Sequence, residues 1–332
     1  MDFLALILSS TIAYGVSLLL VGLGGMFSER SGIINIALEG IMVFGGMFGS
    51  IFLSLVAEAA WVLEHPQWTV LIATVIAGLS GGLLSILLGY AAIKLNADQT
   101  ISGTALNIFA PAFAVALVWA IQGQGLTDIK LPAFIAITAE TFGIDSTTLP
   151  TWLDTLLFKK MYLTIPIAFI LLVISYIVLY KTRFGLRLRA CGEHPQAADS
   201  VGVNVHRMRY SGVIISGVLA GIGGMAFIMS SSQSTFTASV AGYGFLALAV
   251  MIFGNWKPLS IMGAAFFFAF FKTISALAID DRLSFLPTFG LASPEYLYNI
   301  LPYLITMLVL AFTSKKSRAP KAEGIPYDVG KR

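Results

Sequence analysis

Residues 23–42 read LGGMFSERSGIINIALEGIM, and this stretch decides the fold. Its polar break, SERSG at 28–32, separates two long apolar runs at 3–26 and 33–57, which together hold one charged residue, Glu39. A helix needs about 20 mostly apolar residues to cross the hydrocarbon core of a bilayer. The two runs therefore predict two transmembrane helices joined by a short polar connection.

The rest of the chain repeats this pattern. Further apolar spans lie near 68–93, 101–121, 161–180, 210–230, 258–279 and 297–313, and a shorter apolar segment covers 242–254. Of the 332 residues, 57% are apolar and 11% are charged, whereas soluble domains have about 25% charged residues. A soluble core cannot hide so much apolar surface. The composition excludes a soluble enzyme, a disordered protein and a nucleic-acid binder, and it predicts an all-α polytopic membrane protein with about nine transmembrane helices (eight to ten).

Basic residues set the expected orientation. Twelve of the twenty Lys and Arg residues fall in two stretches, 181–209 and 314–332, and cytoplasmic segments of membrane proteins are enriched in these residues. We expect a transmembrane domain over 1–313 with a cytoplasmic loop at 181–209, an outer loop at 122–160 and a loose basic cytoplasmic tail at 314–332. With 242–254 counted as a crossing, the N-terminus lies outside and the C-terminus is cytoplasmic.

Two glycine-rich segments resemble each other. They read VIAGLSGG at 75–82 and VLAGIGG at 218–224, and in the expected topology they run in opposite directions. Such a pair is typical of the inverted repeats of transporters. The alternative is that two glycine-rich packing faces are alike without any shared origin. The first interpretation predicts an internal inverted repeat.

Four polar side chains in the predicted spans or directly before one are candidates for a transport pathway or for positioning helices, namely Asn35, Glu39, Gln99 and Asn107. Asn35 and Glu39 are four residues apart, so a continuous helix places them on one face. An ionised carboxylate at this depth is costly unless it is paired. Glu39 therefore either lines a pathway or ties helices together, through Arg30 or through backbone amides. Asn107 fits a pore or an interhelical hydrogen bond equally well.

The sequence contains no motif for chemistry of its own. It has no G-x-x-x-x-G-K-[ST] phosphate loop, no H-E-x-x-H and no set of Cys or His residues at metal-binding spacing. The chain is therefore not expected to be an enzyme, to hydrolyse ATP, or to hold a metal or cofactor.

The basic stretch 182–202 reads TRFGLRLRACGEHPQAADSVG and predicts a short helix. Pro195 fits the first turn of that helix and Gly202 fits its end. Ala197, Ala198 and Val201 lie between them as a small apolar face, which suits docking into the groove of a partner. A solvated basic loop is the alternative.

Four blocks in this order, 23–42, 97–107, 182–204 and 242–258, resemble the ABC-importer permeases of the nucleoside-uptake branch. The wider family includes permeases for ribose-like sugars and branched-chain amino acids. The sugar branch typically has G-G-I-D-L-S-V-G where this chain has SGIINIALEG at 31–40. That difference favours nucleosides over sugars.

The resemblance implies a permease subunit in a bacterial plasma membrane. Its expected partners are a second homologous permease subunit, ATPase subunits that bind ATP and Mg²⁺, and an extracytoplasmic substrate-binding lipoprotein. In the family the short cytoplasmic helix transmits closure of the ATPase to the spans, and the resemblance gives this coupling role to Gly192, Glu193, Pro195, Ala197, Ala198 and Gly202. The alternatives are a permease for ribose-like sugars and, from another class, an ion-coupled secondary transporter in which Glu39 is the coupling carboxylate.

Overall fold

The computed structural model describes residues 2–144, 149–230, 234–279 and 318–328, with single positions between 300 and 311. Seven of its helices are long and apolar enough to cross a membrane. They are α1 (Asp2–Arg30), α2 (Leu38–Val56), α4 (Pro66–Gly89), α5 (Gln99–Gln122), α7 (Thr164–Lys181), α10 (Val205–Ser230) and α12 (Pro258–Ile279). Each matches a span expected from hydropathy. The span expected at 297–313 lies almost entirely outside the described residues, so the count of nine stays a prediction.

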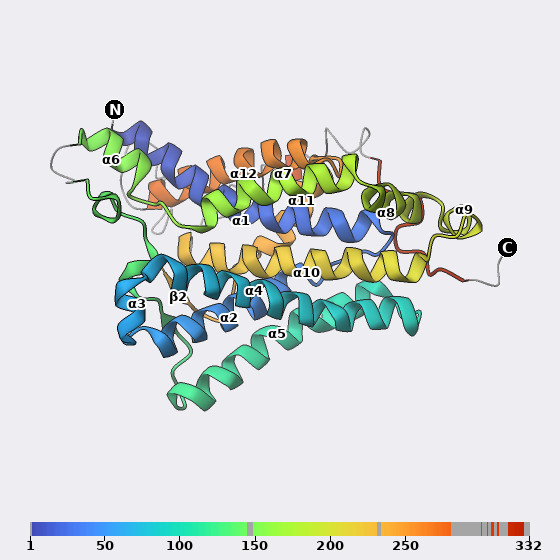
Figure 1. The fold of residues 1–332 in the computed structure, drawn as a ribbon, viewed down its shortest axis with the longest axis horizontal. Helices are drawn as coiled ribbons and strands as arrows, with labels where there is room; N and C mark the ends of the chain where they lie inside the picture. Colours follow the sequence, from blue (N-terminus) through green and yellow to red (C-terminus); the bar gives the residue numbers. More distant parts are fainter. Residues whose placement is uncertain are drawn as a thin grey trace, which may run out of the picture.

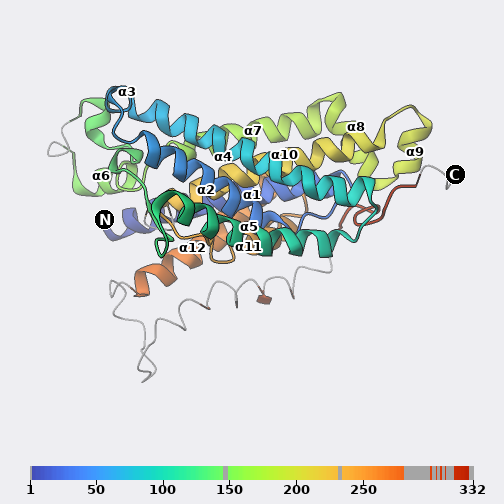
Figure 2. The same ribbon diagram turned by 90° about the horizontal axis from the view of Figure 1, so that it is seen from below.

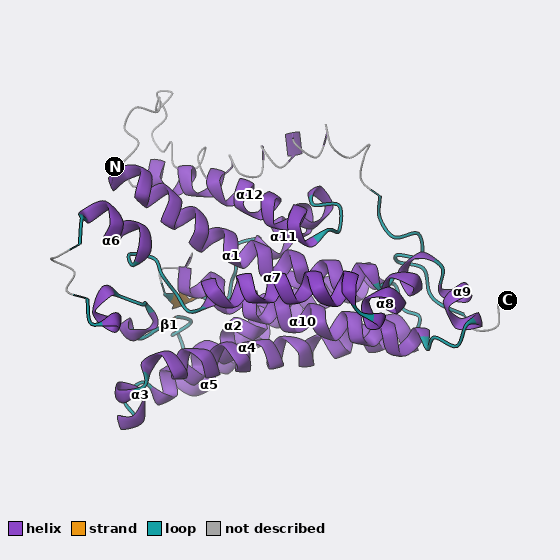
Figure 3. Ribbon diagram, turned by 45° about the horizontal axis from the view of Figure 1, so that its top comes forward, coloured by secondary structure: helices purple, strands orange, loops and turns teal. Residues whose placement is uncertain are grey.

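Short elements gather at the two ends of this bundle (Figures 1 and 2). One end carries α8 (Arg183–Glu193) and α9 (Pro195–Ser200), and we name it the α9 end. The other, the α6 end, carries α3 (Ala60–Glu64), α6 (Thr151–Leu157), β1 (Ile129–Lys130) and β2 (Thr235–Phe236). The remaining elements are η1 (Tyr90–Lys94), η2 (Ala133–Ile135), η3 (Ala139–Phe142) and α11 (Tyr243–Phe253). The start of the chain lies at the α6 end, and residues 318–328 lie at the α9 end (Figure 3).

The segment 242–254 is a half-length helix inside the bundle. The chain leaves α10 at the α6 end, where β2 pairs antiparallel with β1. It then enters the bundle without helical structure, with Val240 buried, and continues as α11, whose first residue, Tyr243, is also buried. The 11 residues of α11 span about 16 Å, roughly half of a hydrocarbon core. The segment before α11 and α11 itself carry the chain from the α6 end towards the α9 end, and a membrane crossing by this stretch stays a prediction.

Helices α1 and α10 form the centre of the bundle. In both, 78% of the apolar span is buried within the chain, whereas the value for α5 is 17%. A helix that is apolar on all sides is surrounded either by protein or by lipid. Helices α1 and α10 are surrounded mainly by the other helices of the chain. The Ser17 hydroxyl of α1 donates to the Gly223 carbonyl of α10 at 2.8 Å and adds a polar tie between them. The exposed faces of α5 and α7 are left for lipid or another subunit.

The two glycine-rich segments pack against each other. Gly78 lies beside Ile222 and Gly82 beside Val218, so α4 and α10 run antiparallel at this contact. A Cβ atom on Gly81 or Gly221 would collide with the backbone of the facing helix. Small residues allow this close approach in membrane helices. The packing explains why both segments are rich in glycine, and the inverted repeat itself stays a prediction.

The tail is not loose over residues 318–328, which corrects the expectation from its polar composition. Ala322 and Tyr327 are buried, each with 6% of its surface exposed. Backbone amides of this segment donate to Gly192 and Gly32 of the bundle. Composition indicates only that such a segment cannot form a core of its own, and here the α9 end supplies the surface on which it folds.

Candidate functional site

The break between α1 and α2 is not helical, which corrects the expectation that Asn35 and Glu39 share a helix face. Helix α1 ends at Arg30 and α2 begins only at Leu38. Gly32 adopts a left-handed conformation with φ +98, which favours glycine and ends α1. Asn35 therefore lies in irregular backbone, whereas Glu39 lies in the first turn of α2. Four-residue spacing places side chains together only within a continuous helix.

Two side chains of α5 stabilise this break. The Ile34 amide donates to Oε1 of Gln99 at 2.8 Å. Nδ2 of Asn107 donates to the Ile36 carbonyl, and its Oδ1 accepts from the Gly40 amide, both at 2.8 Å. Irregular backbone at membrane depth needs such partners because lipid offers none. Gln99 and Asn107 thus supply the hydrogen bonds that a helix would have made internally.

Asn35 faces α10. Its side chain is fully buried, and its Nδ2 donates to the Ser216 hydroxyl at 2.8 Å. Within the described part of the chain its Oδ1 has no hydrogen-bond partner. A buried amide oxygen without a partner costs about 1–3 kcal/mol. Asn35 therefore keeps an acceptor available for a donor that approaches the break, and its contact with a solute stays a prediction.

Glu39 joins α2 to α11. Its carboxylate accepts from the Gly242 amide at 2.8 Å and from the Gly244 amide at 2.6 Å. A Cβ atom on Gly244 would collide with the Glu39 backbone, so the first turns of the two helices lie in direct contact. Helix N-termini carry partial positive charge and unpaired amides, and a carboxylate satisfies both. The partner of Glu39 is therefore the start of α11, while Arg30 lies elsewhere.

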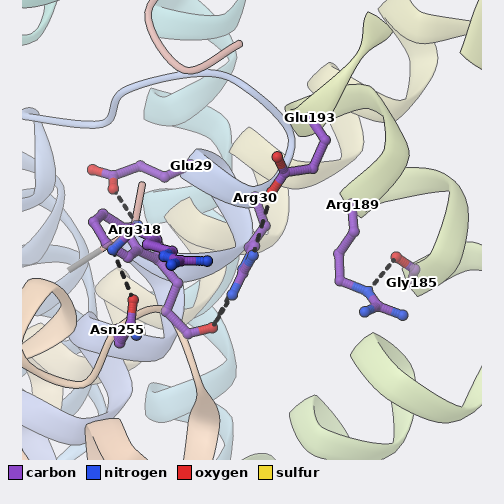
Figure 4. Close-up of polar contacts among 8 residues, drawn as sticks. Glu29, Arg30, Gly185, Arg189, Glu193, Asn255 and Arg318 are labelled. Atoms are coloured by element: carbon purple, nitrogen blue, oxygen red, sulfur yellow. Dashed lines mark hydrogen bonds and ion pairs between the residues drawn. The ribbon is translucent and has the colours of Figure 1, made fainter. Parts of the chain in front are cut away.

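Arg30 belongs to a polar network at the α9 end (Figure 4). Its Nε and Nη2 donate to the Trp256 carbonyl at 3.3 and 3.1 Å, and its Nη1 lies 3.9 Å from Oε1 of Glu193. The indole Nε1 of Trp256 donates to the Glu29 carboxylate at 2.5 Å. This network connects the end of α1 to α8 and to the α11–α12 connection. An open cavity of ≈ 630 Å³ adjoins it, lined by Arg30, Glu193, Asn255, Lys257, Arg318, Ala319 and Lys321.

Helix α9 has the boundaries that its sequence predicts, whereas α8 forms in a stretch that the sequence predicts only as part of a loop. Pro195 begins α9, and Gly202 follows its end with φ +82. The Thr182 hydroxyl caps α8 by accepting from the Gly185 amide at 3.1 Å. A Cβ atom on Gly192 would collide with the Arg30 carbonyl, so the end of α8 rests directly on the end of α1.

The small apolar face expected on α9 is divided in the structure. Ala197 is exposed, and Val201 has 78% of its surface exposed. Ala198 is buried and packs with Cys191, Val205 and Tyr327. Only Ala197 and Val201 are therefore available to a partner. The inward position of Ala198 escaped sequence reasoning because Tyr327, which covers it, lies far along the chain.

Cys191 is shielded from solvent and from reaction. Its side chain is fully buried, and burial raises the pKa of its thiol to about 11, against the opposing effect of the Arg209 charge. The reactive form of cysteine is the thiolate. Since the pKa lies well above neutral pH, the thiol stays protonated there and reacts slowly.

Sequence reasoning missed the residues that connect the α9 end, above all Trp256, Arg209 and Tyr327. The only signal was the position of Trp256 at the end of an apolar segment and the unusual polar pair Glu29–Arg30 at the end of α1. Among the residues that the structure describes, no group of three or more His, Cys, Asp or Glu side chains is arranged to hold a metal ion.

Comparison with known proteins gives one family over most of the chain. The family described as the permease component of branched-chain amino acid transport systems matches residues 7–310. The chain is 39% identical over 332 residues to the guanosine ABC transporter permease protein NupQ of Bacillus subtilis (strain 168), covering 100% of this chain and 99% of the relative. No solved structure matches the chain.

Two proteins of Lactococcus lactis subsp. cremoris (strain MG1363) are also similar. The nucleoside ABC transporter permease protein NupC is 36% identical over 333 residues, covering 98% of this chain and 97% of the relative. The nucleoside ABC transporter permease protein NupB is 32% identical over 108 residues, covering 32% of this chain and 30% of the relative. These matches confirm the resemblance carried by the four sequence blocks and identify a multi-pass membrane subunit. The chain therefore belongs to the family of permease components of branched-chain amino acid transport systems.

Proposed function

We propose that this chain is a permease subunit of a nucleoside ABC importer in a bacterial plasma membrane. ATP binding and hydrolysis take place on partner ATPase subunits, with Mg²⁺, and drive alternating access in the membrane subunits. The observation that carries the proposal is that α9 presents Ala197 and Val201 to solvent while α8 rests on the end of α1 beside the break. A movement imposed on α9 from outside the chain has a short physical route to the membrane interior.

The substrate and the partners rest on the relatives. Two of them are named for guanosine and for nucleosides and match the chain over almost its full length. Two different permeases of one Lactococcus lactis strain both resemble this chain, which supports pairing with a second, similar subunit. A substrate-binding lipoprotein would deliver the solute on the outer side. Neutral nucleosides offer hydroxyls and ring nitrogens, which suit amides such as Asn35 better than fixed charges.

The test is uptake by vesicles that contain the complete complex. The chain is reconstituted with its second permease, ATPase and binding protein, and the uptake of labelled guanosine, adenosine, ribose and leucine is compared with and without ATP. ATP-dependent uptake of nucleosides alone supports the proposal. Uptake of ribose alone favours the sugar importer, and uptake driven by an ion gradient without the ATPase favours the secondary transporter.

The α9 end is expected to face the cytoplasm. Leu95 at the α4–α5 connection and Leu126 in the segment before β1 are both exposed, at 61% and 56%. In intact cells an impermeant thiol reagent should label Leu126→Cys but not Leu95→Cys, and should label both once the membrane is opened. The buried native Cys191 gives little background, which the unchanged chain measures directly. Labelling of Leu95→Cys alone in intact cells would reverse the orientation.

Bulk at Ala197 is expected to uncouple transport from ATP hydrolysis. Ala197 is exposed on α9, so Ala197→Trp leaves the fold intact but obstructs a groove that receives the helix. One interface side chain is worth up to a few kcal/mol, so we expect uptake to fall about tenfold or more. Uptake and ATPase activity are measured per folded complex, with Ala197→Ser as the control of similar size. Wild-type uptake by Ala197→Trp would show that α9 is only a solvated connection.

A further inference from the structure

Residues 318–328 form a segment that we name the C-terminal strap. It lies across the α9 end of the bundle, next to α8, α9 and the start of α10 (Figure 1). The family match ends at residue 310, so the strap lies outside the part of the chain that defines the family. Its contacts are nevertheless with the elements that carry the candidate site.

The first half of the strap connects α8 to the α1–α2 break through backbone hydrogen bonds. The Ala322 amide donates to the Gly192 carbonyl at 2.8 Å, and the Gly324 amide donates to the Gly32 carbonyl at 3.2 Å. Gly324 has φ +74, and a Cβ atom there would lie 2.8 Å from the Ile34 side chain. Two strap residues thus hold the end of α8 and the start of the break in fixed register.

The second half of the strap packs beneath α9. Nη1 of Arg209, a buried residue of α10, donates to the Ile325 carbonyl at 3.1 Å. The Tyr327 ring is buried and packs with Ala198 of α9 and with Cys191. Its centroid lies 5.4 Å from that of His206. The inner face of α9 and the strap therefore share one buried hydrophobic cluster.

The strap also meets the polar network at the end of α1. The Arg318 amide donates to Oδ1 of Asn255 at 3.1 Å. The Glu323 carboxyl is hydrogen-bonded to the Glu29 carboxyl. Burial raises the pKa of the Glu323 carboxyl, whereas this hydrogen bond and the positive charge of Arg30 lower it. The segment thus contacts the α11–α12 connection as well as α1, α8 and α10.

We propose that the C-terminal strap is a coupling element that transmits movement of α9 to the α1–α2 break, with Tyr327 as its principal positioning residue. This inference rests on the proposed function, because it assumes that an ATPase moves α9. The physical argument is continuity. Tyr327 shares a buried cluster with Ala198 of α9. Five residues earlier, the Ala322 amide is hydrogen-bonded to α8, and Gly324, which lies between these two residues in the sequence, is hydrogen-bonded to Gly32 at the break. Displacement of α9 therefore shifts the backbone that bears Asn35.

The experiment uses the complete complex in vesicles and compares four forms of the chain, with a fifth form as the matched control. They are the unchanged chain, a chain lacking residues 318–332, Tyr327→Ala and Tyr327→Phe. Ile325→Ala is the matched control, because the Ile325 side chain is 56% exposed. The hydrogen bond that Arg209 donates to the Ile325 carbonyl involves the backbone and is kept in this variant. Two quantities are measured: stimulation of the ATPase by the substrate-loaded binding protein, and uptake per ATP hydrolysed. Copurification of the ATPase reports assembly.

We expect the truncated chain and Tyr327→Ala to assemble normally and to retain basal ATP hydrolysis. Both should lose about fivefold or more of the binding-protein stimulation and of the uptake per ATP, in line with the usual size of coupling between sites. Tyr327→Phe keeps the ring and should recover most of both quantities, and Ile325→Ala should match the unchanged chain.

Normal stimulation by the truncated chain would overturn the proposal. Loss of ATPase copurification in the truncated chain and in Tyr327→Ala would also overturn it, since the strap would then serve assembly. Failure of the proposed substrate has a different signature. In that case the unchanged complex would take up another solute and no nucleoside. The binding protein would then be loaded with that other solute, and its stimulation of the ATPase would still test the strap.

Discussion

Gly221→Val is expected to remove most folded protein from the membrane. Gly221 lies where α10 meets α2 and α4, beside Gly45 and Gly81. A Cβ atom at this position would collide with the Ala77 carbonyl of α4. That obstacle is helix backbone, which cannot rotate away as a side chain would. Overpacking typically costs about 1–3 kcal/mol, and forcing α4 and α10 apart also exposes their contacts, so we expect folded protein to fall about tenfold or more.

The matched control is Gly263→Val on α12. Among the residues that the structure describes, nothing lies within 4 Å of a Cβ atom built at Gly263, which is also a glycine in a membrane helix. The two substitutions therefore have equal effects on helix propensity and hydropathy. Folded protein is measured as the monodisperse fraction after extraction in mild detergent, together with resistance to trypsin. Equal yields of the two variants would show that the α4–α10 contact is not tight.

Glu39→Leu is expected to reduce folded protein strongly, and Glu39→Gln to do so partially. Leucine removes both acceptors for the Gly242 and Gly244 amides, and the loss of a partner for each buried donor costs about 1–3 kcal/mol. The first turns of α2 and α11 then meet without a negative charge between them. Glutamine keeps one acceptor oxygen but loses the charge.

The measurement is uptake normalised to folded protein in the membrane. A positioning role predicts that Glu39→Leu lowers the amount of folded protein far more than the activity of each folded molecule. A fully folded but inactive Glu39→Leu would contradict this role. Glu39 would then be an ion-coupling carboxylate, and the secondary transporter would become the better interpretation of the chain.

Hydropathy predicts the described membrane helices well because it is a local property. Each long apolar run has to form a helix in lipid, where unpaired backbone groups find no water, and the end of α1 at Arg30 falls within the polar break SERSG. The same local rules predict the start of α9 at Pro195 and the turn at Gly202. They fail at Asn35, because a side chain of another helix can replace the hydrogen bonds of a helical turn.

The sequence by itself determined the fold class, the long spans and the bounds of α9, since apolar length, proline and glycine act on their own neighbourhood. Only the tertiary structure decided the partners of the polar residues. Glu39 binds backbone 203 residues away, Asn35 binds a hydroxyl 181 residues away, and Tyr327 covers Ala198. Residues so distant in sequence meet only because the central helices pack through their glycine contacts. The hydrogen bonds of the break, the contact of α11 with Glu39 and the strap are therefore products of packing, which no local pattern encodes.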